Sequence, residues 1–190
     1  MEPLEAHLAQ HCAPTVLGVK AGSMISLSQE EFPDLVGLLR RYNLSLGPRG
    51  LYSTVLAARN GRNLLLIYRP KLLERDLAKP EARRILHRCG YPAGGLGSQL
   101  SHLRMRLEQT DGIPHEIGLF LDYPPADVDG FLSGAPCRYR GYWKVYDDVE
   151  QAREKFACYD ACRSCLTQYL AAGHSISQLL SGLEIQKPVS

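Results

Sequence analysis

Cys12 and His115 are the two residues whose types predict a nucleophilic site. Cys12 lies just before Pro14, a residue that is common in the first turn of a helix, so we predict that the thiol is at a helix N-terminus. Unpaired N–H groups and the helix dipole favour the thiolate there. His115 opens the run "HEIGLFL", which predicts a strand. In this hypothesis the imidazole accepts the thiol proton, and Asp122, which follows the strand, orients the ring.

A structural role stays open for both residues. A free cysteine is commonly a small buried hydrophobe, and a histidine before a strand can cap a turn by bonding to the backbone. The helix after Cys12 would also be short, because Gly18 and Gly22 weaken it. The later strand "GYWKVY" offers no side chain to orient the imidazole, so Asp122 and Asp147 are the nearest carboxylates.

Three further cysteines, Cys158, Cys162 and Cys165, have the spacing C-x3-C-x2-C, by which radical SAM enzymes hold an iron–sulfur cluster. Here they lie in a strong helical pattern, where the first and third are about 10 Å apart along the axis. Because a cluster needs a loop that wraps it, the spacing instead predicts one stripe on the core face of a helix. A zinc or iron site built from two of them with His11 or Cys12 stays open, so the metal ligands are unknown.

Tyr142, Lys144 and Tyr146 alternate along the strand predicted for "GYWKVY" and therefore share one face. A lysine between two tyrosines can hold an anionic ligand, which makes these three the predicted ligand-binding residues. The alternative is an exposed amphipathic face of a sheet. Trp143 and Val145 fall on the opposite face, toward the core.

Local signals predict the elements that position these residues. Asn60-Gly61 joins two β-rich runs, which is a strong signal for a hairpin with a type I′ turn. Ser28 and Glu31 form a capping box that predicts a helix to about residue 43. Further helices are predicted over residues 70–89, in two parts if Pro80 breaks the pattern that Gly90 ends, and over 96–107, 124–132 and about 148–172.

These elements predict an α+β fold in one domain that spans residues 1–190. A chain of 190 residues is long enough for one sizeable core. We expect about five strands in a mostly antiparallel sheet, with helices packed mainly on one face.

Composition narrows the class of function. The chain has 22 basic and 20 acidic residues and a net charge of +2, which argues against a dedicated nucleic-acid binder. No apolar run approaches the roughly 20 residues of a membrane span, and the acidic start "MEPLEAHLAQHC" differs from a signal peptide. We therefore expect a cytoplasmic protein whose six cysteines are reduced. Nothing in the sequence requires a cofactor.

Several motifs together carry a resemblance to a known family. The segments are "HCAPTVLGVKAGSMISL", "LLLIYRPKLL", "HEIGLFLDYPPADVDGF", "GYWKVYDD" and "FACYDACR". In order and spacing they resemble an uncharacterised family of short bacterial proteins, domain of unknown function 3793, over almost the whole chain. The resemblance implies a bacterial cytosolic protein of one domain, and it brings no activity, cofactor or catalytic residues.

Two hypotheses for function follow. The order of Cys12 and His115 is similar to papain-like thiol hydrolases, and "HEIGLFLD" resembles the histidine run of NlpC-type peptidases. The alternative is a non-catalytic binding or accessory protein, metal- or redox-linked, with an unidentified protein partner. The sequence thus leaves open whether the protein is an enzyme. A sulfur within hydrogen-bonding distance of the imidazole favours a thiol hydrolase or acyltransferase that uses Cys12 and His115. A large exposed apolar patch that contains Tyr123, Pro124 and Pro125, with Cys12 buried away from His115, favours the binding protein.

Overall fold

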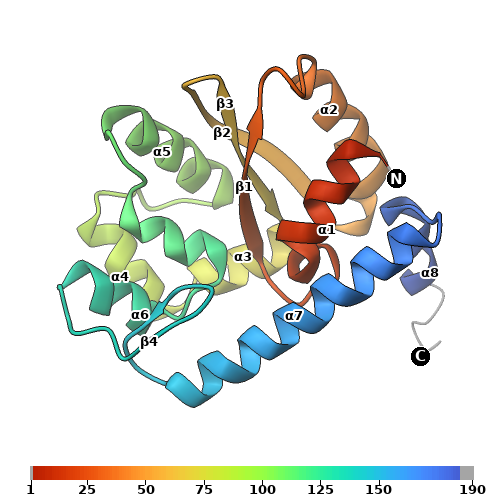
Figure 1. Ribbon diagram of the computed structural model, residues 1–190. Coiled ribbons are helices and arrows are strands. Elements are labelled where there is room, and N and C mark those ends of the chain that lie inside the picture. The colour runs from red at the N-terminus through yellow and green to blue at the C-terminus, as the bar shows by residue number, and fades with distance from the viewer. Residues whose placement is uncertain (1, 185–190) are drawn as a thin grey trace.

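The computed structural model describes residues 2–184, and a three-stranded antiparallel sheet lies at its centre (Figure 1). The strands are β1 (Gly22–Ser28), β2 (Tyr52–Arg59) and β3 (Arg62–Tyr68), in the order β1-β3-β2. Asn60 and Gly61 connect β2 to β3 with φ values of 49° and 70°, and a type I′ turn requires positive φ at both positions. The hairpin predicted from this dipeptide is therefore confirmed.

Helices surround the sheet and supply most of the described chain. They are α1 (Pro3–Val16), α2 (Leu35–Leu46), η1 (Gly47–Arg49), α3 (Pro70–Leu77), α4 (Pro80–Arg88), α5 (Leu96–Gln109), η2 (His115–Leu121), α6 (Pro125–Leu132), α7 (Val149–Ala171) and α8 (Ile176–Glu184). The predicted helices over 70–89, 96–107, 124–132 and 148–172 are confirmed. Gly90, with a φ of 82°, follows the end of α4. Among residues 2–184, every helix lacks the length or the apolar composition that a membrane span requires.

The helix α2 begins later than the capping box predicts. Ser28 is the last residue of β1, so its backbone is committed to the sheet, and its hydroxyl accepts from the N–H of Glu30. The actual cap is Asp34, whose carboxylate accepts from the N–H of Gly37 at 3.1 Å. The helix therefore starts at Leu35.

The prediction of a five-stranded sheet is wrong, although all strand pairs are antiparallel. The run "HEIGLFL" forms the 3-10 helix η2, and each residue from Glu116 to Leu121 is buried. A short run that is apolar on all sides does not distinguish a strand from a buried helix. The region of "GYWKVY" contributes only a separate ribbon of two residues a strand, β4 (Tyr139–Arg140) and β5 (Lys144–Val145).

Helices cover both faces of the sheet, which corrects the expectation that they pack mainly on one. Alternation along β1 and β3 directs Ile25 and Ile67 to one face, and Met24 and Leu66 to the other. On the first face lie α1, α2, α7 and α8, and on the second lie α3 to α6 with η2 (Figure 1). The sheet therefore separates two hydrophobic cores.

A smaller third cluster fixes the β4–β5 ribbon against α7. It contains Trp143, Val145, Phe156 and Tyr159, so Trp143 and Val145 face the core as predicted. Trp143 packs edge-on against Phe156 with their ring centroids 4.5 Å apart. The ribbon is thereby held against α7.

Side chains, rather than a further strand, occupy the outer edge of β2. Asn43 donates its Nδ2–H to the carbonyl of Ser53 at 2.9 Å and accepts the N–H of Ser53 at 2.8 Å. Arg104 from α5 donates from Nε to the carbonyl of Val55 at 3.1 Å. These polar groups of the edge therefore have partners within the chain.

Candidate functional site

An open cavity of about 530 Å³ is lined by residues of β1, η2, α6 and the β4–β5 ribbon. Its walls are mainly apolar, and they include Met24, Ile117, Leu121, Val128, Phe131 and Trp143. His115, Asp127 and Lys144 add charged or ionisable groups to this lining. An apolar cavity with a few placed polar groups is the usual form of a small-molecule site.

Gly118 and Asp122 shape the wall that η2 contributes. A Cβ at Gly118 would lie 2.9 Å from both the Tyr123 ring and the Val128 side chain, so glycine lets η2 and α6 approach this closely. Asp122 has a left-handed backbone with a φ of 60°, which turns the chain out of η2. Pro125 in the first turn of α6 then begins the next helix.

Asp127 fixes the indole of Trp143 in the cavity wall. Its carboxylate, 4% exposed, accepts from Nε1 of Trp143 at 2.7 Å and from the backbone N–H groups of Tyr146 and Asp147 at 2.6 and 3.1 Å. Sequence reasoning missed this role. The sequence shows only that Asp127 lies in the first turn of a predicted helix, where an acid is favoured by the helix dipole alone. This position does not reveal that the carboxylate also binds the indole.

His115 and Lys144 meet at the ring of Phe131. The imidazole packs on this ring at a centroid distance of 4.5 Å, and the Lys144 ammonium lies 4.9 Å from the same centroid. Both side chains are exposed, and among residues 2–184 neither has an ion-pair partner within 4.0 Å. The mouth of the apolar cavity therefore carries a cation that is free to meet an anion.

The three predicted ligand-binding residues do not act as one face. Tyr146 stays near Lys144, because its ring packs edge-on against Phe131 at 6.3 Å. Tyr142 lies in the turn between β4 and β5, where its hydroxyl donates to Asp160 at 2.8 Å. With only two residues in each strand, the ribbon is too short for the alternation that the sequence predicts.

Cys12 lies inside α1, so the prediction that it is at a helix N-terminus is wrong. Pro3, and not Pro14, occupies the first turn. The thiol is 0% exposed, and burial raises the pKa of Cys12 to about 12. Cys12 belongs to the core on the Ile25 face of the sheet, whereas His115 begins η2 and lines the cavity on the other face. The structure does not bring the two together as the thiol hypothesis requires.

We therefore expect Cys12 to be inert toward iodoacetamide in the native protein, because its thiol is buried and protonated at pH 8. The exposed Cys158 and Cys165 serve as internal controls that should be alkylated under the same conditions. Mass spectrometry of the labelled peptides measures each rate. Rapid labelling of Cys12 that is lost in His115→Ala would instead establish a thiolate–imidazole site.

Asp122 lies at the opposite end of η2 from His115. The two are seven residues apart, which is about 14 Å at roughly 2 Å per residue of a 3-10 helix. The Asp122 carboxylate instead accepts from the hydroxyl of Tyr159 at 3.4 Å. It lines a separate polar cavity of about 170 Å³, and burial raises its pKa.

The cysteines of α7 are only partly on its core face. Cys162 is buried, but Cys158 and Cys165 are exposed, so the predicted core stripe is wrong for two of the three. The core face is centred on Tyr159 and Leu166, and at about 100° per residue the cysteines lie to one side of it. Within residues 2–184, no three His, Cys, Asp or Glu side chains are grouped to hold a metal ion.

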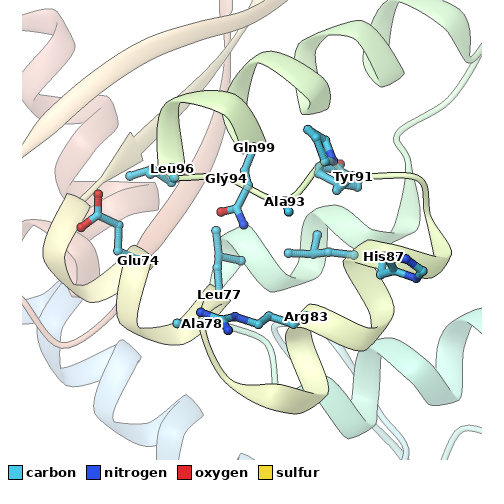
Figure 2. A pocket seen from close by; sticks show the side chains of 13 residues that line it. Glu74, Leu77, Ala78, Arg83, His87, Tyr91, Ala93, Gly94, Leu96 and Gln99 are labelled. Carbon is cyan, nitrogen blue, oxygen red and sulfur yellow. The ribbon is translucent and has the colours of Figure 1, made fainter.

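A second large cavity, of about 570 Å³, lies between α3, α4 and the start of α5 (Figure 2). Figure 2 shows Arg83 extended toward Ala78, and Gln99 pointing into the space between the helices. None of the site residues predicted from the sequence lines this cavity. Two of the predicted site residues, His115 and Lys144, instead line the cavity of about 530 Å³ beside Phe131.

Comparison with known proteins identifies one family. A family model described as "Protein of unknown function (DUF3793)" matches residues 8–180. No curated protein and no solved structure matches the chain.

Proposed function

This chain belongs to the DUF3793 family, and we propose that it is a binding protein for a small, mainly apolar molecule that carries an anionic group. One observation carries the proposal: His115 and Lys144 converge on the Phe131 ring at the mouth of an apolar cavity of about 530 Å³. The role needs no proton transfer and is therefore independent of Cys12.

Each part of the cavity has a distinct physical role. Burying about 150 Å² of apolar ligand surface contributes about 4 kcal/mol before the cost of association, at about 25 cal/mol per Å². The Lys144 ammonium contributes less binding free energy than the burial of apolar surface. It orients the ligand, because the anionic group is favoured only at the mouth of the cavity, where this ammonium lies. Asp127 keeps the indole wall in place, so the cavity is formed before the ligand arrives.

The fluorescence of Trp143 tests this proposal, because it is the one tryptophan of the chain and it lines the cavity. Octanoate and octanol are suitable probes, since they have the same chain length and differ in charge. We expect both to change the emission saturably, and octanoate to bind about threefold more tightly.

Lys144→Met should remove the preference for octanoate and leave octanol binding unchanged. Lys71→Met is the matched control, because Lys71 is an exposed lysine on α3 and lines none of the cavities described above. The absence of any saturable response, or an equal effect of the two variants, contradicts the proposal.

A further inference from the structure

The cavity of about 570 Å³ between α3, α4 and the start of α5 is lined by polar side chains that have no partner in the described chain (Figure 2). They are those of Glu74, Arg83, His87 and Gln99. Among residues 2–184, none of these four side chains makes a hydrogen bond or an ion pair. Gln99 is half-buried and points into the space between the helices. The donors and acceptors of this lining are therefore open to a ligand.

Glu74 and Arg83 differ from most charged side chains of this region, which pair within the chain. The pairs among residues 70–88 and beyond are Arg75–Asp76, Lys79–Asp76, Arg84–Glu81 and Arg88–Asp129. No ion pair within 4.0 Å joins Glu74 to Arg83. Figure 2 shows their charged ends well apart, one on α3 and one on α4. The cavity therefore presents an acid and a base to separate parts of an occupant.

The buried part of the lining is mainly apolar. It consists of Leu77, Leu86, Leu96 and Tyr91. The Tyr91 hydroxyl already donates to Glu116 at 3.3 Å, so the ring is what Tyr91 offers to the cavity. Burial of apolar groups against these side chains is favourable. An apolar interior below unpaired polar groups is the usual form of a small-molecule site, and this volume lies within the usual range.

We propose that this cavity is a second binding site, for a dipeptide with apolar side chains. The carboxylate of the ligand binds the guanidinium of Arg83, whose N–H donors match two carboxylate oxygens. The ammonium of the ligand binds the carboxylate of Glu74, and its peptide group pairs with the carboxamide of Gln99. The apolar side chains of the ligand cover the three leucines of the cavity.

The separation of the two charges favours a dipeptide over a free amino acid. An amino acid carries its ammonium and carboxylate on the same carbon atom, so it cannot reach two groups that lie apart. An extended dipeptide separates its charges by about 7 Å, at about 3.5 Å per residue. Its two ends can therefore meet Glu74 and Arg83 at the same time.

Three dipeptides that differ only at their ends test the two charges separately. At pH 7 leucyl-leucine carries both charges, its N-acetyl form carries only the carboxylate, and its amide carries only the ammonium. We expect leucyl-leucine to bind about fivefold more tightly than either capped form, a modest factor because Glu74 and Arg83 are exposed. Saturation-transfer nuclear magnetic resonance of the ligand methyl groups measures each dissociation constant.

Two variants assign each end of the ligand to its partner. Arg83→Gln should weaken leucyl-leucine and its N-acetyl form about fivefold and leave the amide unchanged. Glu74→Gln should weaken leucyl-leucine and the amide by about the same factor and leave the N-acetyl form unchanged. Arg84→Gln is the matched control, because Arg84 is exposed on the same helix, pairs with Glu81 and lines neither large cavity.

The proposal is overturned if leucyl-leucine shows no saturable binding, if the three dipeptides bind equally, or if Arg84→Gln weakens binding as much as Arg83→Gln. The site is also distinct from the cavity beside Phe131, since the two share no lining residue. Leucyl-leucine should therefore leave the octanoate response of Trp143 unchanged. Displacement of octanoate would place the dipeptide in the cavity beside Phe131 and contradict the proposal.

Discussion

Asp127→Ala is expected to lower the free energy of unfolding by about 3 kcal/mol, because three N–H groups lose a charged acceptor. The indole N–H of Trp143 is buried and has no other acceptor to turn to within the described contacts. The β4–β5 ribbon should loosen, and the octanoate response of Trp143 should be lost. Urea unfolding followed by circular dichroism measures the first effect, and fluorescence titration measures the second.

Asp129→Ala is the matched control for this variant. Asp129 lies on the same helix two residues later, but it is about half exposed and pairs with Arg88 at the surface. A surface ion pair contributes at most about 1 kcal/mol, so this variant should unfold almost as the parent does. Equal destabilisation by the two variants would show that Asp127 does not hold the ribbon.

Lys20 is a buried cation between α1 and β1, and Lys20→Met is expected to raise the free energy of unfolding at pH 7 by about 1 to 2 kcal/mol. Lowering the pKa of Lys20 from 10.5 to about 8 corresponds to a cost of roughly 3 kcal/mol for burying the ammonium. Two cation–π contacts, with the rings of Tyr123 and Tyr159 and worth about 1 kcal/mol each, offset part of this cost. Methionine fills a similar volume and carries no charge.

The sign of the pH dependence follows from the direction of this shift. The folded protein holds the Lys20 proton less tightly than the unfolded chain, so the cost is fully present below pH 8 and disappears between pH 8 and 10.5. The advantage of Lys20→Met should therefore shrink over that range. Urea unfolding at pH 7 and pH 9.5 measures it, with the exposed Lys71→Met as the control. A destabilised Lys20→Met at both values contradicts the expectation.

Elements with a local cause could be predicted from the sequence. The Asn60-Gly61 turn and the leucine pattern of α5 depend on neighbouring residues alone, and both are confirmed. The strand expected at "HEIGLFL" is a 3-10 helix, because its apolar side chains are buried by several elements rather than by pairing with a strand. The start of α1 was misplaced because proline occurs at both residue 3 and residue 14, and each fits a first turn.

The candidate site was only partly predictable, because tertiary packing assembles it. His115 and Lys144 were singled out separately, and only the folded chain brings them both to the ring of Phe131. Asp127 binds N–H groups that follow it by 16 to 20 residues. Lys20 carries no local signal, since its burial depends on Tyr123 and Tyr159, more than a hundred residues further along the chain.

The hydrogen bonds of Asn43 affect the tendency of this protein to aggregate at high concentration. An open strand edge is a template on which another chain can polymerise, as in cross-β assemblies. A carboxamide has a donor and an acceptor like a peptide group, so Asn43 gives Ser53 the partners that an incoming strand would offer. Strand-by-strand growth of aggregates from β2 must therefore first break bonds that the monomer already has, which places a kinetic barrier at this edge.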